Sequence, residues 1–489
     1  MGSLPVLSRS RNYMDWSADD TIAAIRNKTV TAREYISNVL DRAQLAKPLN
    51  AFIRLLPDEA LSAADKIDHA IAHGHDLPPL AGLAIVTKDN INQAGVPTTG
   101  GTAALLNNRP SKTAPSLRRL MQAGAIVIGR ANMHELAFGI TSTNLQPFAN
   151  AVHNPYDMNM IPGGSSGGTA AAIASRVVTC GLGTDTGGSA RIPAALTGIA
   201  GFRPSVGDGS DDRRYHDTHA VVPISHTRDT IGPLGRTVAD ITLLDSIISR
   251  RPRVQPTELS GLRLGIPPVL WSGLDENLEK VLLSVNDRLR DAGVVLVKDD
   301  IPNLLELDST IGNPIALHEP IADMPAYLKK SHTKNVDLKK IVDGIASPDV
   351  KKLFDLVLSD ALGTEYKDVM KVRRPALQKL FSTYFAEKHI DAILFPTTIL
   401  PAVPIDYLNG SGNVTINGGP PMDAFATYTR NSGPGSNAGI PGLSIPAGLT
   451  PAGLPVGIEI NGPLGSDDRL LAIGLAIESL LGPLPPPKL

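Results

Sequence analysis

The sequence predicts an α/β fold with a parallel or mixed sheet, because short apolar runs alternate with helical segments. Residues 83–86 and 125–129 are uninterrupted apolar runs of the kind that form buried strands. Between them a helix is expected over residues 116–123, and Gly124 ends it. A strand, a helix and a second strand in this order form a βαβ unit, whose two strands lie parallel in one sheet.

Two helices are expected before this unit, and each begins with a capping pair. Ser17 with Asp20, and Thr31 with Glu34, place a hydroxyl at the helix start and a carboxylate three residues later. In this arrangement the side chains accept hydrogen bonds from backbone N–H groups that the first helical turn leaves unpaired. We therefore expect a helical region ahead of the first strand of the βαβ unit.

The rest of the chain continues the alternation of strands and helices. Residues 167–175 are rich in alanine and other small residues, which predicts a tightly packed, buried helix. An amphipathic helix is expected over residues 278–289, and the stretch 300–390 is mainly helical and charged. Further strands are expected at residues 177–182, 262–266, 392–395, 443–445 and 456–460.

Composition argues against several classes of protein. The chain has 489 residues, a net charge of −2 and 4% aromatic residues, so neither a basic surface nor a set of stacking rings invites nucleic acid. No apolar stretch reaches the ~18 residues of a membrane span. Residues 1–16 lack the apolar core of a secretory signal, and the single cysteine, Cys180, suits a reducing compartment. We therefore expect a cytoplasmic protein without membrane or nucleic-acid partners.

Two serines set among glycines are the strongest chemical signal. Ser165 lies in PGGSSGG, residues 162–168, and Ser189 lies in GTDTGGSARIP, residues 183–193. Glycine lets backbone N–H groups face a ligand, and such groups beside a hydroxyl suit acyl transfer, because they stabilise an oxyanion next to a nucleophile. Lys88, directly after the first apolar strand, is the candidate base, because burial disfavours its ammonium form.

The glycines taken alone admit two other interpretations: a turn that binds nothing, and a phosphate loop of the nucleotide type. The glycine spacing over residues 181–187 is one residue too long for a dinucleotide loop, and Asp185 would repel a phosphate. Lys88 could equally be an ion-paired surface lysine, which is the common fate of lysines. It can act as a base only if Asp89 points away from it.

With both serine motifs present, the chain resembles the amidase signature family. That family reads GGSS[GS]G, then a helix of small residues, then G-x-D-x-GGS-x-R-x-P, and the likeness covers about residues 17–480. In the family, a lysine, a serine in a cis peptide and a nucleophilic serine form a triad. The resemblance implies that Lys88 is the base, Ser165 the bridging cis-serine and Ser189 the nucleophile.

The surroundings of the triad follow from the same comparison. Backbone N–H groups of the loop before the nucleophile could converge on a developing oxyanion. In this family residues 132–144 line the site, and two apolar side chains there would form a wall of the acyl pocket. Asp185 and Arg191 are signature positions that we expect to brace the loop as a structural pair. The expected oxyanion and substrate-binding residues are Thr186, Gly187, Gly188, Phe138, Gly139 and Ile140.

Length alone would suggest two or three domains, but the resemblance implies one, residues 1–489. It implies a single large α/β/α domain, with a central mixed, largely parallel twisted sheet covered by helices on both faces. The catalytic core lies in residues 17–250, and residues 250–390 form a variable, mainly helical lid or subdomain. Strands in residues 391–480 complete the sheet, and residues 481–489 are a proline-rich tail.

No cofactor and no metal is expected. His69 and His73 share a helical face, and His216 and His219 lie close together in the sequence. No acidic partner completes a zinc-type site in either place, so these histidines do not predict metal binding.

The expected reaction is hydrolysis of a small-molecule amide through an acyl-enzyme. Residues 201–233 look like the mandelamide- and indoleacetamide-hydrolase branch, whose members cleave primary amides of aryl-bearing acids. We therefore expect an amidase, monomeric or homodimeric, for small aryl or alkyl primary amides. Esters, anilides and carbamates are candidate side substrates.

Two alternatives remain open at this point. The A subunit of a tRNA-dependent amidotransferase has the same triad, but it carries a Tyr-Gly-Leu-Val-Ala-type run before a Ser-Ser-Leu-Asp motif, and residues 222–229 do not match it. A catalytically inactive relative could serve as a binding module. Such relatives tend to lose the serine or the lysine, which this chain keeps.

Overall fold

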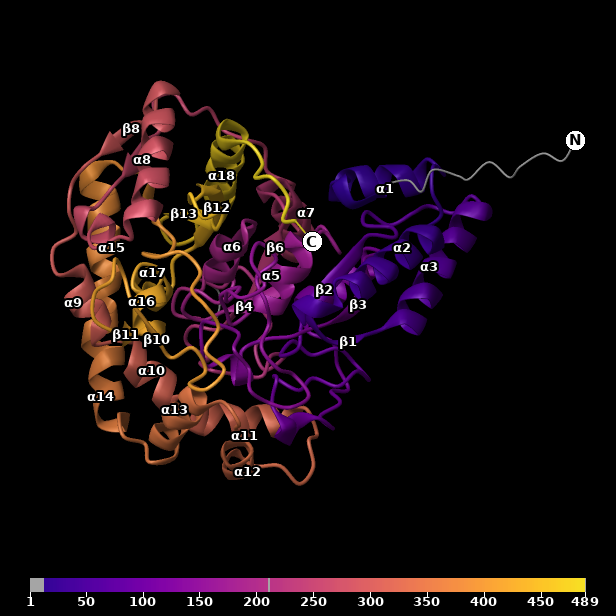
Figure 1. The fold of residues 1–489 in the computed structure, drawn as a ribbon, viewed down its shortest axis with the longest axis horizontal. Coiled ribbons are helices and arrows are strands. Elements are labelled where there is room, and N and C mark those ends of the chain that lie inside the picture. Colours follow the sequence, from indigo (N-terminus) through magenta and orange to yellow (C-terminus); the bar gives the residue numbers. More distant parts are fainter. Residues whose placement is uncertain (1–12, 210–211, 489) are drawn as a thin grey trace, which may run out of the picture.

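One large mixed sheet runs through the protein, and helices lie on both of its faces (Figure 1). The computed structural model describes residues 13–209 and 212–488. Residues 1–12, which hold most of the segment considered above for a secretory signal, lie outside the described residues. Among the described residues, no helix is both long enough and apolar enough to cross a membrane.

The strands share one long ladder, apart from a small separate pair. The large sheet consists of β1 (Phe52–Leu55), β2 (Ala84–Lys88), β3 (Ile126–Ala131), β4 (Cys180–Asp185), β5 (Ala200–Arg203), β6 (Thr230–Gly235), β7 (Arg263–Gly265), β8 (Val295–Val297), β9 (Ala392–Pro396), β12 (Gly442–Leu449) and β13 (Pro455–Asn461). The separate pair consists of β10 (Asn413–Val414) and β11 (Met422–Asp423). In the described part of the chain, the 11 strands of the large sheet follow the order β1-β3-β2-β4-β6-β5-β12-β13-β9-β7-β8.

The helices surround this sheet. They are α1 (Ala18–Arg26), α2 (Ala32–Leu45), α3 (Pro57–Ala72), α4 (Pro115–Gln122), α5 (Gly167–Ala174), α6 (Arg191–Thr197), α7 (Val238–Ser249), α8 (Glu276–Asp291), α9 (Leu304–Ser309), α10 (Gly312–His318), α11 (Pro320–Lys330), α12 (Leu338–Asp343), α13 (Pro348–Leu358), α14 (Gly363–Asp368), α15 (Arg374–Lys388), α16 (Ala424–Thr429), α17 (Gly433–Ala438) and α18 (Asp467–Leu481). Figure 1 shows α1–α3 and α14–α15 on opposite sides of the molecule.

The first two helices begin where their capping pairs predicted. The Ser17 hydroxyl accepts a hydrogen bond from the amide of Asp20, whose carboxylate accepts one from the amide of Ser17. The Thr31 hydroxyl accepts a hydrogen bond from the amide of Glu34. Both predicted helix starts are confirmed.

The sheet is mixed, as expected, but the expectation that it is largely parallel is wrong. Parallel pairing joins β2 to β3 and β4, and β7 to β8 and β9. The pairings of β1 with β3, and those that lead from β4 to β9, are antiparallel. Only five residues, 450–454, connect β12 to β13, and so short a connection permits an antiparallel return but no crossover.

Parallel pairing of β2 with β4 brings separate segments of the chain to one edge of the sheet. Thr87 lies opposite Leu182, so the carboxyl ends of the two strands, at Lys88 and Asp185, meet at this edge. Strand β6 runs antiparallel to β4, with Thr230 opposite Asp185, so the residues before β6 arrive at the same edge. The edge therefore collects polar residues from three strands.

Both faces of the sheet are covered, as predicted. Val86 points into a cluster with Ile36 of α2 and Ala171 of α5. Its neighbour Ile85 points the opposite way, into a cluster with Leu120 of α4 and residues of α7. Successive side chains of β2 therefore pack in apolar clusters on opposite faces of the sheet. Because both faces are buried, residues 83–86 form an uninterrupted apolar run.

Strand β4 covers Cys180–Asp185, whereas residues 177–182 were predicted. Every residue of β4 has a partner in β6, which lies far along the chain, and this pairing extends the strand to Asp185. Strand signals in the second half of the sequence are confirmed. The strands predicted around 262–266, 392–395, 443–445 and 456–460 are β7, β9, β12 and β13.

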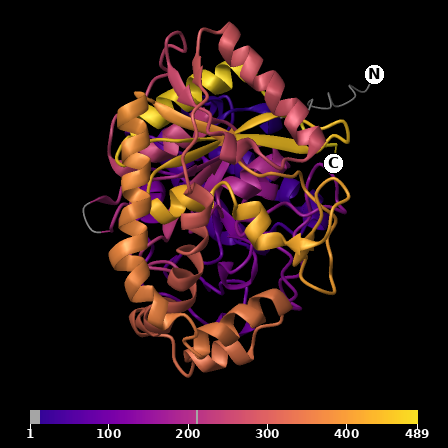
Figure 2. The same ribbon diagram turned by 90° about the vertical axis from the view of Figure 1, so that its left-hand side faces the viewer.

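The stretch 300–390 is helical, as predicted. Helices α11, α12 and α13 gather at one end of the molecule, and Figure 2 shows them below the strands. Met324 of α11 and Phe354 of α13 share an apolar cluster with Phe138 and Ile224. This helical region therefore packs against loops of the core.

Helix α5 lies so close to the neighbouring backbone that it tolerates no side chain at Gly168. A Cβ there would lie 2.3 Å from the carbonyl oxygen of Asn132 and 2.5 Å from that of Ala51. We predict that Gly168→Ala lowers the free energy of unfolding by about 3 kcal/mol, because neither backbone segment can move aside. Denaturant unfolding of the purified variant measures the loss. Gly312→Ala is the control, because its Cβ would meet no atom closer than 3.4 Å, and an equal loss in both variants would contradict the prediction.

Candidate active site

Lys88 is the last residue of β2, and its side chain is fully buried. Its Nζ donates to the Ser165 Oγ at 2.7 Å and to the Thr184 Oγ1 at 2.8 Å. The Thr184 hydroxyl also accepts a hydrogen bond from the Asn90 side-chain amide, at 3.0 Å. The amine is thus held between two hydroxyls at the edge where β2 and β4 end.

This setting changes the proton affinity of the amine. Burial lowers the pKa of Lys88 to about 7, although the charges of Asp185 and Asp229 act in the opposite direction. The adjacent Asp89 points away from Lys88, because its Oδ1 accepts a hydrogen bond from the Arg130 Nε at 3.0 Å. A neutral amine is therefore available close to neutral pH, which meets the condition that the sequence set for a lysine base.

Ser165 lies two residues before the first residue of α5, Gly167. The peptide bond between Gly164 and Ser165 is cis, as the family resemblance implied. Ser165 is fully buried, and its Oγ is the one that contacts Lys88. The next residue, Ser166, donates from its hydroxyl to the carbonyl of Thr184 at 3.2 Å, which ties this segment to β4.

Ser189 lies in the loop between β4 and α6. The amide of Ser166 donates to the carbonyl of Ser189 at 3.1 Å, so the two serine segments run side by side. Ser189 is 5% exposed, whereas Lys88 and Ser165 are 0% exposed. A Cβ added at Gly187 would meet no atom within 4 Å, so open space lies over this loop. Of the three residues, Ser189 is therefore the one with access to a ligand.

The predicted oxyanion donors need one correction, at Gly188. This residue has a φ of +132°, and a Cβ would lie 2.5 Å from the Ser432 Oγ, so the backbone requires glycine. Its amide, however, donates to the Asp185 Oδ1 at 3.0 Å and faces that carboxylate. The prediction that this N–H faces an oxyanion is wrong, because the loop uses it for its own structure. Thr186 and Gly187 remain candidates.

The expected structural pair next to Ser189 is confirmed and is part of a larger network. The Asp185 Oδ1 accepts hydrogen bonds from the Arg191 Nη2 at 3.0 Å and from the Arg203 Nη1 at 3.1 Å. Glu459 also binds Arg191, and all four side chains are fully buried. Burial alone would raise the pKa of Asp185, but the charges of the two arginines outweigh it and lower that pKa. The loop that carries Ser189 is therefore fixed by buried ion pairs.

Residues 132–144 lie against the backbone of the cis-serine. The amide of His134 donates to the carbonyl of Ser165 at 3.2 Å, and the amide of Gly167 donates to the Ser142 Oγ at 3.1 Å. This segment therefore supports the backbone that directly follows the cis peptide bond.

Its central residues are buried in different surroundings. Phe138 packs on Phe354 of α13, with ring centroids 4.5 Å apart. Ile140 belongs to the same apolar cluster as Ile192 of α6. A Cβ at Gly139 would overlap the ring of His134. Phe138 thus faces the helical region, whereas Ile140 lies toward the helix that follows Ser189.

Sequence reasoning missed three residues of the site, which contact either Lys88 or the loop that carries Ser189. Thr184, which holds the lysine amine, stood inside the second motif but was not singled out. The Asp229 Oδ1 accepts a hydrogen bond from the Thr186 hydroxyl at 2.6 Å. The Ser432 hydroxyl donates to the carbonyl of Gly187 at 2.8 Å. The last two come from distant segments, and no local pattern marks them.

A group of possible metal ligands lies where the sequence did not suggest one. In the described part of the chain, His226, Glu319 and Asp323 form the one such group, with a ligand atom of each within 4.8 Å of the others. The His226 Nδ1 already lies 3.0 Å from the Asp323 Oδ2, and Glu319 accepts several hydrogen bonds. We interpret the group as an ion-paired cluster.

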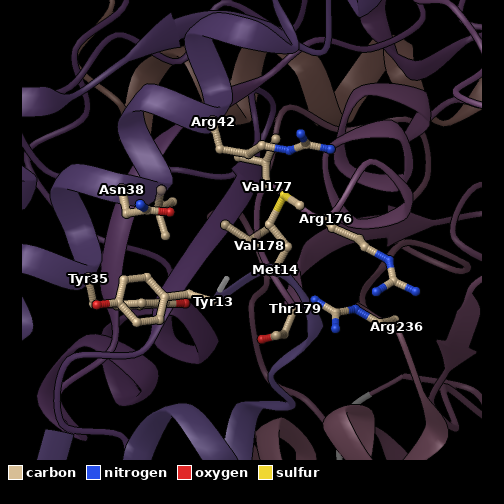
Figure 3. Close-up of a pocket in the computed structure, with 11 residues that line it drawn as sticks. Tyr13, Met14, Tyr35, Asn38, Arg42, Arg176, Val177, Val178, Thr179 and Arg236 are labelled. Atoms are coloured by element: carbon tan, nitrogen blue, oxygen red, sulfur yellow. The ribbon is translucent and has the colours of Figure 1, made fainter. Parts of the chain in front are cut away.

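A small cavity far from Ser189 is lined by three arginines, Arg42, Arg176 and Arg236 (Figure 3). Its residues Val178 and Thr179 precede β4, whereas Ser189 follows that strand, so the cavity lies at the opposite end of β4. Its volume of about 10 Å³ has room for roughly one water molecule. It is too small for an amide substrate.

Comparison with known proteins agrees with this geometry. The family described as Amidase matches residues 34–471. Indoleacetamide hydrolase of Rhizobium radiobacter is 40% identical over 470 residues, 95% of this chain and 97% of that protein. Mandelamide hydrolase of Pseudomonas putida is 40% identical over 497 residues, 99% of this chain and 94% of that protein. The X-ray structure of native peptide amidase from Stenotrophomonas maltophilia has a TM-score of 0.81 and 27% identity, and the match covers 98% of this chain and 99% of that one.

The chain therefore belongs to the amidase signature family, and the resemblance carried by the two serine motifs is confirmed. It is an amidase, a hydrolase that acts on amide bonds. The likeness to solved amidases over nearly the whole chain also confirms a single α/β domain built on a large mixed sheet.

The buried ion pairs around Asp185 give a prediction about stability. Asp185→Asn should lower the free energy of unfolding by about 3–5 kcal/mol, because it leaves Arg191 and Arg203 buried without their shared carboxylate. Asp65→Asn is the matched control, because Asp65 pairs with Arg33 on the surface and should contribute no more than about 1 kcal/mol. Denaturant titration compares the two variants, and similar losses would show that the network does not stabilise the fold.

Proposed function

We propose that the enzyme cleaves amides through an acyl-enzyme at Ser189, with Ser165 as the proton relay and Lys88 as the base. One observation carries the proposal: the buried contact of 2.7 Å between the Lys88 Nζ and the Ser165 Oγ, directly beside the Ser189 segment. The Ser189 hydroxyl passes its proton to the Ser165 Oγ, while Ser165 passes its own proton to the neutral lysine amine. The Ser189 oxygen then attacks the carbonyl carbon of the amide.

The same three residues complete the cycle in reverse. Protonated Lys88 returns its proton through Ser165 to the nitrogen of the tetrahedral intermediate. The carbon–nitrogen bond then breaks, and ammonia or an amine leaves. Water then attacks the acyl carbon and gives up a proton along the same route to Lys88. The bond between the acyl carbon and the Ser189 Oγ breaks, the proton returns through Ser165 to Ser189, and the acid leaves. No step uses a metal or a cofactor.

The oxyanion of the intermediate would be stabilised by backbone N–H groups of the 186–189 loop. Gly187 borders open space, which supports its amide as a donor, and Thr186 is held in place by Asp229. The amide of Gly188 is excluded from this role, because it faces Asp185. Loss of one such donor typically lowers the rate about 10²–10³-fold.

We propose small aryl or alkyl primary amides as the substrates, with esters, anilides and carbamates as side substrates. The names of the two relatives at 40% identity, which refer to amides of aryl-bearing acids, support this class. Phe138, Gly139 and Ile140 would form the apolar wall of the acyl pocket. Their segment contacts Ser165, which supports this placement.

The organisation of the enzyme around this chemistry is also a proposal. Residues 17–250 would carry the catalytic core, residues 250–390 a lid, and residues 391–480 the strands that complete the sheet. We propose a monomer or a homodimer that acts in the cytoplasm without nucleic acid. The free, buried thiol of Cys180 supports a reducing compartment.

Ser189→Ala should abolish hydrolysis of a panel of aryl and alkyl primary amides and also labelling by a fluorophosphonate, because the variant lacks the proposed nucleophile. Turnover assays and intact-mass spectrometry measure the two effects. Ser175→Ala is the control, because the hydroxyl of this buried serine donates to the carbonyl of Ala172 in α5, and the variant should keep both activities. A label that survives Ser189→Ala would reassign the nucleophile. A wild-type preference for esters or carbamates over primary amides would contradict the substrate class.

The pH dependence of the wild-type enzyme tests Lys88. Only the neutral amine accepts a proton, so kcat/KM should rise with pH and level off above the pKa of about 7. Below that pKa, it should fall about tenfold for each pH unit. Lys88→Met keeps the length of the side chain without a base, and it should reduce amide hydrolysis far more than hydrolysis of activated esters, whose leaving groups need no proton. The fall of kcat/KM at low pH is called the acid limb below. If Lys88→Met shows the same acid limb as the wild type, Lys88 is not the base of the mechanism.

A further inference from the structure

A carboxylate outside the triad holds the loop before Ser189. The Asp229 Oδ1 accepts the hydrogen bond of 2.6 Å from the Thr186 hydroxyl. Its Oδ2 accepts hydrogen bonds from the amides of Ile224 and Ser225, at 2.8 and 2.9 Å. Asp229 directly precedes β6, and β6 pairs with β4 up to the residue before Thr186. One carboxylate therefore fastens the 224–229 loop to the proposed oxyanion loop.

The other side of the 224–229 loop is fastened to the helical region. Glu319, which directly precedes α11, is buried. Its carboxylate accepts hydrogen bonds from the Ser225 hydroxyl and from the amide and hydroxyl of Thr227. It also accepts one from the Tyr366 hydroxyl at 2.8 Å. The loop is thus held between a carboxylate of the core and a carboxylate of the 300–390 region.

An ion pair reinforces the outer contact. His226 lies half exposed between Asp323 and Glu319, with its Nδ1 3.0 Å from the Asp323 Oδ2 and its Nε2 3.4 Å from the Glu319 Oε1. The amide of His226 also donates to the Asp323 Oδ2 at 2.8 Å. Hydrogen bonding to Asp323 raises the pKa of His226. Helix α11 is therefore bound to the loop by its acidic residue, Asp323, and by Glu319 directly before it.

A cavity of about 50 Å³ lies beside these contacts. Its lining residues include Asp229 and Thr230 as well as Asp323 and Tyr327 of α11. The 224–229 loop connects α11 to the Ser189 loop by hydrogen bonds, and its Ile224 also shares an apolar cluster with Met324 of α11.

We propose that Asp229 and Glu319 are positioning residues, which carry the placement of α11 through the 224–229 loop to Thr186 and so keep the oxyanion donors in register with Ser189. This inference rests on the proposed function, since it assigns the two acids to the same acyl transfer. Neither acid exchanges a proton or contacts the substrate.

Asp229 has a second effect, which a purely structural residue would lack. Its charge, together with that of Asp185, raises the pKa of Lys88 against the effect of burial. The groups that face Asp229 include Arg213, whose Nη1 donates to the main-chain carbonyl of Asp229 at 2.6 Å, and Asp323, whose charge acts on it from α11. Removal of the charge of Asp229 should therefore make Lys88 easier to deprotonate.

Asp229→Asn tests the contact between the Asp229 carboxylate and the Thr186 hydroxyl. We expect kcat to fall about 10–100-fold with KM nearly unchanged, because a displaced donor affects the oxyanion more than the bound amide. The acid limb of kcat/KM should also move to lower pH. Fluorophosphonate titration of Ser189 counts the folded, active sites, so kcat refers to intact enzyme. A kcat equal to that of the wild type, or a loss of kcat without movement of the acid limb, would overturn the assignment of Asp229.

Glu319→Gln tests the contact between Glu319 and the 224–229 loop. It should separate the effect on kcat from the effect on the pKa of Lys88. It should lower kcat about tenfold and leave the acid limb in place, because Glu319 is not among the charges that act on Lys88. The matched control is Asp343→Asn, an exposed acid of the same helical region that pairs with Lys339, and it should change neither quantity. An unchanged kcat in Glu319→Gln would overturn the connection to α11.

A variant cycle keeps the proposal testable if Asp229→Asn does not fold. Thr186→Val removes the same hydrogen bond from the other side, whereas Thr186→Ser keeps it and should retain most of the activity. If Glu319 acts through this bond, the double variant Thr186→Val with Glu319→Gln should lose no more kcat than Thr186→Val alone. Additive losses would overturn the proposal. If the wild-type enzyme itself shows no fall of kcat/KM at low pH, or no labelling by the fluorophosphonate, the acyl-transfer mechanism is refuted. Failure of the proposed function is therefore distinguishable from failure of the positioning role.

Discussion

Removal of one lysine amine from water is the constraint on which the rest of this structure depends. A lysine in water has a pKa near 10.4 and is almost entirely protonated at neutral pH. Lys88 is fully buried at the end of β2, where desolvation brings its pKa to about 7 and two hydroxyls accept its hydrogen bonds. Parallel pairing of β2 with β4 sets this amine beside Thr184, and α5 brings Ser165 to the same point.

A polar site in the interior needs a rigid frame, and the frame here is also polar. The loop that carries Ser189 is held by Asp185, which receives hydrogen bonds from the Gly188 amide and from two buried arginines. Each of these charges would be costly alone, and together they satisfy one another. The same carboxylate acts on Lys88 and keeps its pKa from falling further. Asp185 therefore contributes both to the stability of the fold and to the proton affinity of Lys88.

The helical region of residues 300–390 is connected to this frame by hydrogen bonds as well as by apolar packing. Phe138 packs on Phe354 on one side, while Glu319 binds the 224–229 loop on the other. Residues 132–144 contact the backbone of Ser165, and the 224–229 loop contacts the loop before Ser189. Sequence variation in the helical region can thus reach the site by two routes, which gives a physical basis for different substrate preferences on one catalytic core.

The sequence by itself determined the features that depend on neighbours along the chain. Capping pairs, apolar strands and the glycine-set serines are local patterns, so the first helices, β2, β3 and the triad candidates Lys88, Ser165 and Ser189 were all predicted. Only the tertiary structure decided the antiparallel majority of the sheet and the contacts of Asp229 with Thr186 and of Glu319 with the 224–229 loop. The physical reason is that hydrogen-bond partners tens or hundreds of residues apart are chosen by how the strands pair and how the helices pack.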